Sequence, residues 1–110
     1  MIPNKPIDRT EDNGTLPSSA DNALIARFLD HAWAERGLAK ASLSSYGADL
    51  RGLAGWLAIR GRGLIDSDRA VLFDYLAARH GKGMKPRSGA RLVSTLKQFH
   101  AWAVEKGYRT

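Results

Sequence analysis

Five side chains between residues 43 and 57 recur at intervals of three, four, three and four residues, and this spacing constrains the fold more than any other feature. They are Leu43, Tyr46, Leu50, Leu53 and Leu57. An α-helix turns once in about 3.6 residues, so the series lies on one helical face, which must be buried against other elements. We expect this helix to run from a Ser42 cap to about Arg60, where a glycine-rich turn over residues 61–63 ends it.

The same helical spacing occurs in three further segments. We expect one helix over residues 22–35 behind an Asp21 cap, another from a cap at Asp66 or Ser67 to about His80, and a last one over residues 88–106. The side chains expected to point inward are Leu24, Ile25, Phe28, Leu29, Ala32 and Trp33, then Val71, Leu72, Tyr75 and Leu76, then Leu92, Val93, Leu96, Phe99 and Ala103, with Trp102 as a further candidate. Since no segment alternates like a strand and the connections are short, the sequence predicts an all-α fold, a compact four-helix bundle.

The first twenty residues differ in composition from the rest of the chain. They contain three prolines and a cluster of small polar residues, with too little apolar content to offset the entropy of ordering. We therefore expect a disordered tail over residues 1–20 and one helical domain over residues 21–110. Residues 1–21 carry two basic and four acidic side chains, whereas the remainder carries fifteen basic and seven acidic. A domain this basic favours nucleic acid or an anionic membrane surface as its partner.

Composition also excludes several kinds of chemistry. The chain has no cysteine, which rules out disulfides, thiolate metal ligands and thiol catalysis. Its histidines, at positions 31, 80 and 100, show no pairing typical of a metal site, and we expect neither metal nor cofactor. No apolar run approaches the roughly 18 residues of a membrane span. The first residues lack the hydrophobic centre of a secretory signal, so we expect a cytoplasmic protein without a membrane partner.

Residues 79–97 form the most one-sided segment, with six Lys or Arg and no Asp or Glu. The segment runs from a Gly-rich turn, which includes Lys82 and Lys85, into the last predicted helix. Loop amides and the start of a helix favour anions, as basic side chains do. The charge and the local geometry therefore indicate a surface for phosphates, although a solvated basic face without a partner is the alternative.

Two predicted helices carry a polar face opposite their core face. On the last helix Arg87, Arg91, Ser94 and Gln98 lie opposite Leu96 and Phe99, when each residue advances by about 100°. Such side chains contact phosphates and base edges, and a helix presenting them can enter a major groove. On the helix after Ser42, the face away from the apolar series holds Ser44, Ala48, Arg51 and Gly55, and its small residues would let a duplex approach closely. The alternative interpretation of each face is an ordinary solvent face.

Three motifs, in order, carry a resemblance to a known family. Residues 45–50, followed by Trp56 and Leu57, are similar to a Ser-Tyr-x-x-Asp-Leu element with a Trp-Leu pair. Residues 35–43 resemble the opening that precedes this element, and residues 87–99 resemble the family's last helix. Residues 24–108 thus resemble the N-terminal, core-binding domain of Xer-type tyrosine recombinases and phage integrases, which is a SAM-like helical domain.

The resemblance implies a role in DNA recombination and integration. In these recombinases this domain and a C-terminal catalytic domain of the same chain form a clamp on double-stranded DNA, and protomers assemble into a synaptic tetramer. The implied contacts come from the second and fourth helices: Lys40, Ser42, Ser44, Ser45 and Arg51 from the former, and Lys85, Arg87, Ser88, Arg91, Ser94, Thr95 and Lys97 from the latter. Lys82 and Gln98 join them from the basic turn and the polar face. The family commonly has basic residues where this chain has Gly47 and Ala48, which predicts a weaker grip by the second helix.

The resemblance places no catalytic residue in this chain. The family's chemistry uses an Arg, Lys and His set with a nucleophilic Tyr, all in the separate C-terminal domain. Tyr108 follows the last helix at the expected exit toward that domain, and we interpret it as a packing residue. The competing hypothesis is a stand-alone protein-interaction bundle with an incidental basic face, for which an exposed Trp102 would be an anchor.

Overall fold

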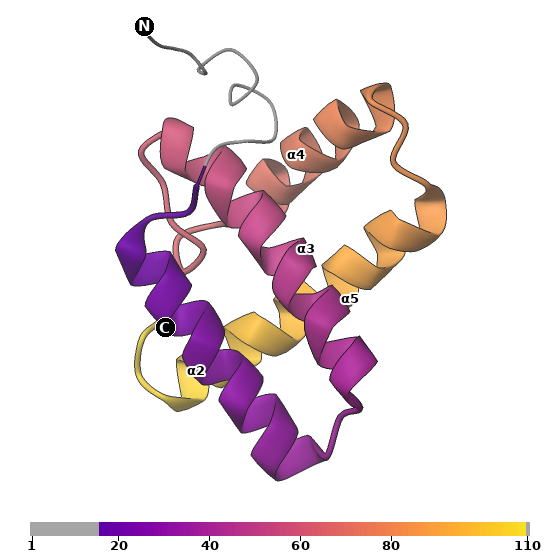
Figure 1. Cartoon of the computed structure of the whole chain (residues 1–110). Coiled ribbons are helices and arrows are strands. Elements are labelled where there is room, and N and C mark those ends of the chain that lie inside the picture. Colours follow the sequence, from indigo (N-terminus) through magenta and orange to yellow (C-terminus); the bar gives the residue numbers. More distant parts are fainter. Residues whose placement is uncertain (1–15, 110) are drawn as a thin grey trace, which may run out of the picture.

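The computed structural model describes residues 16–109, and this part of the chain folds into four helices without a strand. They are α2 (Ser19–Arg36), α3 (Lys40–Ile59), α4 (Arg69–Gly81) and α5 (Pro86–Glu105) (Figure 1). The all-α prediction is confirmed. The tail predicted over residues 1–20 lies mostly outside the described residues, but its boundary is wrong, since α2 already begins at Ser19.

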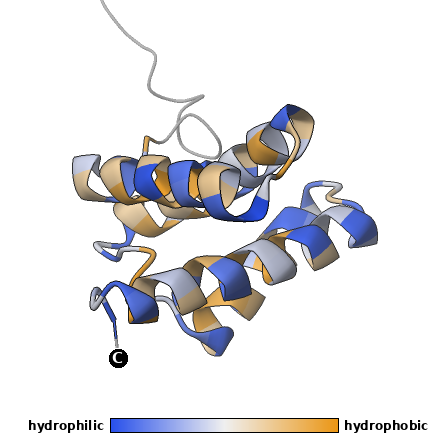
Figure 2. Cartoon of the chain, turned by 90° about the horizontal axis from the view of Figure 1, so that it is seen from below, coloured by the Kyte–Doolittle hydropathy of each residue, from blue (hydrophilic) through white to orange (hydrophobic). Residues whose placement is uncertain are grey.

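The helices form two layers that cross. α2 and α3 lie side by side in one layer, and α4 and α5 make the other, as the view along the layers shows (Figure 2). α3 packs against both α2 and α5, and α5 also packs against α4. Buried apolar side chains from all four helices form one core cluster, and hydrophilic and hydrophobic residues alternate along each helix (Figure 2). α3 and α5 are therefore the helices that hold the bundle together.

The core draws on every helix. Leu50, Leu53 and Leu57 are fully buried, as their regular spacing predicts. Phe28 of α2 packs edge-on against Phe99 of α5, with ring centroids 5.5 Å apart. Such aromatic pairs add to the stabilisation from burial alone. The apolar spacing thus identified the centre of the core correctly.

Two tryptophans depart from expectation in opposite ways. Trp33, predicted to point inward, is 60% exposed. The buried stripe of α2 passes through Phe28 and Ala32, and the next residue is rotated away from it by about 100°. Trp102 is buried and packs against Phe28, with centroids 5.8 Å apart. Trp102 is therefore not the exposed anchor that the hypothesis of a protein-interaction bundle requires.

The helix starts differ by a few residues from the predicted caps. Ser18, rather than Asp21, caps α2, and its hydroxyl accepts a hydrogen bond from the Asp21 N–H at 3.0 Å. At α3 the cap is Ala39 rather than Ser42, and its side chain makes no capping bond. Asp68 caps α4, because its carboxylate accepts from the Val71 N–H at 2.9 Å.

α5 begins at Pro86, two residues before the predicted start. Proline favours the first helical position, where its missing N–H removes no hydrogen bond. None of the described helices combines the length and the apolar character needed to cross a membrane.

Asp21 has a structural task instead of capping. It is almost fully buried, and its carboxylate oxygens accept the Leu64 N–H from the α3–α4 loop at 3.1 and 3.3 Å. Burial raises the pKa of Asp21; the bond from Leu64 lowers it and the nearby charge of Asp66 raises it further. The carboxylate thus ties the start of α2 to the loop, at the cost of burying a charge.

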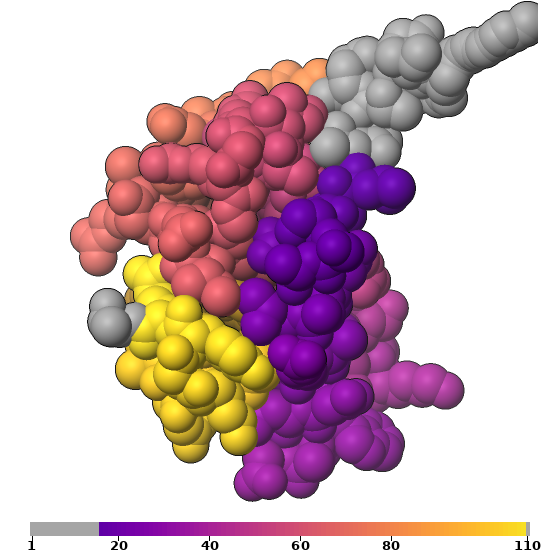
Figure 3. Space-filling view, turned by 90° about the vertical axis from the view of Figure 1, so that its left-hand side faces the viewer, coloured from indigo at the N-terminus to yellow at the C-terminus, as the bar shows by residue number. Residues whose placement is uncertain are grey.

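The same loop is held from its other side by the end of the chain. Leu64 O accepts from the Ser67 hydroxyl at 2.6 Å and lies 2.9 Å from His100 Nε2, and Arg109 donates to Ser67 O at 3.1 Å. We call Asp21, Leu64, Ser67, His100 and Arg109 the loop cluster. Figure 3 shows the loop (rose), the end of α5 (yellow) and α2 (indigo) meeting on one face.

Candidate nucleic-acid interface

The turn between α4 and α5 has the geometry expected of an anion-binding segment. Lys82 ends α4, Gly83 adopts a left-handed conformation with φ of 97°, and Lys85 precedes Pro86. Lys82, Lys85 and Arg87 are all exposed. No side chain caps the first N–H groups of α5, so these donors add to the basic side chains around them. The basic side chains of the predicted phosphate surface therefore point into solvent.

Where α3 and α5 cross, Arg91 meets Asp49 in a two-pronged ion pair. Arg91 Nε lies 2.7 Å from Asp49 Oδ2, and Arg91 Nη2 lies 3.0 Å from Oδ1. We call these residues the crossing pair. The hydrogen bonds and charge of Asp49 raise the pKa of Arg91, which remains a cation. Sequence analysis singled out Arg91 but missed Asp49, whose only signal was its place in the Ser-Tyr-x-x-Asp-Leu motif.

The rest of the polar face of α5 is only partly free. Ser94 and Lys97 are exposed, and Gln98 is half-buried. The Gln98 carbonyl accepts from Arg36 Nη1 of α2 at 2.6 Å, and its amide nitrogen lies 3.5 Å from Ser94 Oγ. Pairing with adenine needs both the oxygen and the nitrogen of a glutamine amide. Arg36 thus takes one of the two acceptor positions of the Gln98 oxygen.

The structure places Thr95, which was predicted to contact DNA, in the core of the domain. Its side chain is fully buried, and its hydroxyl has no hydrogen-bond partner within the described part of the chain. At about 100° per residue, position 95 lies about 40° from Phe99 and about 60° from Leu92, within the buried side of α5. The resemblance supplied this residue, whereas helical geometry excludes it from the outer face. Ser88, in the first turn of α5, is half-buried.

On α3, most of the predicted contacts reach solvent. Lys40, Ser44 and Arg51 are exposed, and Ser42 and Ser45 are half-buried. Gly55 is buried, so its expected place on the outer face is wrong.

Gly47 marks a close approach between α2 and α3. A Cβ there would lie 3.0 Å from Arg51 Nη1 and 3.1 Å from Leu29 Cδ1. The absence of a side chain at position 47 thus leaves room for the Arg51 guanidinium one turn later. The Arg51 side chain is exposed on this surface.

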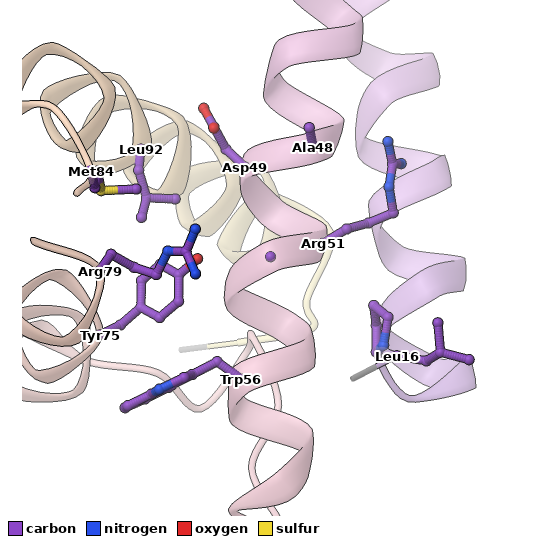
Figure 4. A pocket seen from close by; sticks show the side chains of 11 residues that line it. Leu16, Ala48, Asp49, Arg51, Trp56, Tyr75, Arg79, Met84 and Leu92 are labelled. Carbon is purple, nitrogen blue, oxygen red and sulfur yellow. The ribbon is translucent and has the colours of Figure 1, made fainter. Parts of the chain in front are cut away.

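A hollow of about 360 Å³ lies between α3 and the α4–α5 turn. Arg79 and Tyr75 face it from α4 and Asp49 from α3 (Figure 4). Arg79 Nε is buried without a hydrogen-bond partner among the described residues. Arg79 belongs to the basic segment of the sequence, but it was not among the expected contacts. Within residues 16–109 no group of three or more His, Asp or Glu is arranged to hold a metal ion.

The structure is thus a small helical domain in which α3 and α5 cross and exposed basic side chains lie on α5 and on the turn before it. The sequence profile described as "Phage integrase, N-terminal SAM-like domain" matches residues 25–107. The chain therefore belongs to the family of phage integrase N-terminal SAM-like domains.

Several curated relatives carry the same printed name. The chain is 50% identical over 91 residues to "Tyrosine recombinase XerD" of Xanthomonas axonopodis pv. citri, covering 83% of this chain and 30% of the relative. It is 44% identical over 112 residues to the protein of that name in Xanthomonas campestris pv. campestris, covering 100% of this chain and 35% of the relative. Pseudomonas aeruginosa has another, 39% identical over 90 residues, covering 82% and 30%. The chain spans about a third of the length of these relatives. No solved structure matches it significantly.

Proposed function

We propose that this domain binds duplex DNA as the N-terminal part of a site-specific tyrosine recombinase. The observation that carries the proposal is the basic face of α5, which has no acidic residue from position 86 to position 104. The one carboxylate that reaches it from α3, Asp49, is neutralised by Arg91. Membership of the family and the names of the relatives support recombination as the process served.

The contacts divide by their position on the face. Lys82, Lys85 and Arg87, at the turn, act on phosphates, where charge and an open helix start both favour an anion. Farther along α5, Arg91 and Ser94 lie where base edges come within reach in a major groove.

Other contacts complete the grip. Lys40, Ser44 and Arg51 of α3 hold the backbone of the same duplex, and Lys97 and Gln98 extend the face of α5. A catalytic domain in the same parent chain closes the clamp, and protomers meet in a synaptic tetramer. The domain itself binds without cutting, because the reacting groups lie in that other domain.

Tyr108 supports this division of labour. Its ring centroid lies 5.4 Å from that of Trp102 in a tilted contact, and its hydroxyl accepts from Arg27 Nη1 at 3.4 Å. A nucleophilic tyrosine needs cationic donors arranged around a phosphate. Tyr108 instead packs the end of the chain against α5 and α2.

A mobility-shift titration tests the proposal, with one duplex selected from a randomised pool and one unselected duplex, each at two salt concentrations. Lys85→Ala should weaken binding equally on both duplexes and reduce the magnitude of the salt slope by about 1, because one counterion fewer is released. Arg91→Ala should cost about 1–3 kcal/mol on the selected duplex and less on the other.

Both variants must melt like the parent. Unchanged affinity and salt dependence in both would make the turn an ordinary solvated face, and the protein-interaction bundle would become the better account. Binding of the parent to an acidic protein but to neither duplex would lead to the same conclusion.

A further inference from the structure

The crossing pair leaves one side of Arg91 unused. A guanidinium carries five N–H donors in one plane. Asp49 takes the Nε–H and one Nη2–H. The two donors on Nη1 and the second donor on Nη2 therefore remain, and nothing in the described residues accepts from them. One Nη1–H and the second Nη2–H lie parallel along the Nη1–Nη2 edge, which does not face Asp49, and the other Nη1–H points toward the side of Cδ.

The two partners are buried to different degrees. The Asp49 side chain is 10% exposed and that of Arg91 is 44% exposed. The carboxylate is thus seated in the protein at the junction of α3 and α5, and the cation extends from it to the surface. An arginine held at two points in one plane loses its freedom before any ligand arrives, which a lone surface arginine does not.

On electrostatic grounds alone, an acidic residue such as Asp49 is not expected in a surface that binds DNA. A carboxylate repels phosphates, and an exposed ion pair adds little to stability. The free Nη1–Nη2 edge of Arg91 suggests a role for Asp49, because guanine presents O6 and N7 side by side and accepts two parallel donors from an arginine. A phosphate also accepts two donors, but it occurs at every base pair and needs no fixed plane.

We propose that Asp49 is a positioning residue: it holds Arg91 so that the Nη1–Nη2 edge is presented to a guanine in the major groove, and thereby sets sequence preference. The inference rests on the proposed DNA binding and deepens it. Asp49 itself does not touch the DNA, and its charge lowers affinity for duplexes in general. The same residue thus strengthens binding to the right sequence and weakens binding to others.

In Asp49→Asn, loss of the positioning of Arg91 and loss of the negative charge should change DNA affinity in opposite directions. The variant should bind the selected duplex about tenfold more weakly, since the plane of Arg91 is no longer fixed. It should bind the unselected duplex as tightly as the parent or more tightly, because a negative charge is gone. Asp30→Asn removes an equal charge from an exposed position on α2 and is the matched control; it should leave the ratio of the two affinities unchanged.

A double-mutant cycle separates positioning from charge. In an Arg91→Ala background, Asp49→Asn should no longer weaken binding to the selected duplex, and it should strengthen binding to both duplexes. The Nε–H resonance of Arg91 in the free protein gives a readout without DNA: it should be protected from exchange in the parent and in Asp30→Asn, and lose protection in Asp49→Asn.

Equal weakening of both duplexes by Asp49→Asn, with an unchanged melting temperature, would overturn the proposal and make Arg91 a phosphate contact. Strengthening of both would overturn it in favour of plain repulsion. If the parent binds neither duplex, the proposed function itself is wrong. If the parent binds normally and Asp49→Asn weakens both duplexes equally or strengthens both, only the proposed role of Asp49 is wrong.

Discussion

α5 takes part in two polar clusters, and they differ in where their hydrogen-bonding capacity is directed. In the loop cluster, near its end, His100 and Ser67 converge on the Leu64 carbonyl, and Asp21 takes the Leu64 N–H. In the crossing pair, near its start, Arg91 directs two donors inward and keeps three for solvent. Polar groups whose partners all lie within the protein hold a fold, whereas unsatisfied donors on an exposed cation are available to a ligand.

The largest effect should come from the core that supports both clusters. Leu50 of α3 is fully buried and Leu96 of α5 is nearly so, and both belong to the same hydrophobic core cluster. Truncating either residue to Ala should cost about 2–5 kcal/mol, from lost burial and the cavity left behind. Urea melts measure this loss. A cost below about 1 kcal/mol at either site would mean that the two layers do not share one core.

Asp21→Ala should separate the loop cluster from the crossing pair. It leaves the buried Leu64 N–H without an acceptor, which should cost about 1–3 kcal/mol in urea melts. Asp21→Asn keeps an oxygen for this bond and removes a buried charge, so it should cost clearly less at neutral pH. Neither change should alter DNA affinity well below the melting temperature. An equal loss in both variants would show that the charge, rather than the bond, ties the loop.

Periodicity predicted the fold well, because burial along a helix is a local consequence of spacing. Leu50, Leu53 and Leu57 were assigned to the core from three-and-four intervals alone, and all three are fully buried. Trp33 was assigned to the core wrongly, because each residue turns the helix by about 100° and the position after Ala32 already points to solvent. The cap of α2 was also misplaced. Ser18, the actual cap, lay within the predicted tail. Asp21 was predicted as the cap from its residue type alone, whereas its carboxylate accepts a hydrogen bond from Leu64 in a distant loop.

The candidate site was less accessible to sequence reasoning, because its key contacts join residues far apart in the chain. Arg91 and Asp49 are 42 residues apart, and Arg36 and Gln98 are 62 apart. Spacing within one helix carries no information on such pairs. The resemblance suggested that Thr95 contacts DNA, whereas its helical phase places it inside. The exposed basic residues were predicted correctly as exposed, since charge seldom tolerates burial.

His100 should make the stability of the loop cluster depend on pH. Burial, the largest cause, lowers the pKa of His100; its bond to Leu64 O raises it, and the charge of Arg109 lowers it again. Below about pH 6.5 the unfolded chain therefore binds a proton that the folded chain resists, so stability is complete above this pH and falls on acidification.

Replacing the imidazole tests this dependence. Urea melts of the parent and of His100→Gln between pH 5 and 7 should give a flatter pH dependence for the variant, because the titrating group is gone. The other histidines and Asp21 remain in both proteins, so the difference isolates His100. Equal slopes would remove His100 from the account of the loop cluster.

The smallest effect should come from Thr95, which the resemblance assigned to the DNA surface and the structure places in the core. Its buried hydroxyl has no partner in the described part of the chain, and valine has nearly the same shape without that group. Thr95→Val should therefore stabilise the fold by about 1 kcal/mol or less, and it should leave DNA affinity unchanged on selected and unselected duplexes. Ser94→Ala is the matched control, because Ser94 is the exposed neighbour and its loss should affect only DNA binding. A destabilised Thr95→Val would mean that the hydroxyl is satisfied within α5, by a carbonyl of the preceding turn. Weaker DNA binding with an intact fold would return Thr95 to the interface and require α5 to rotate when it meets the duplex.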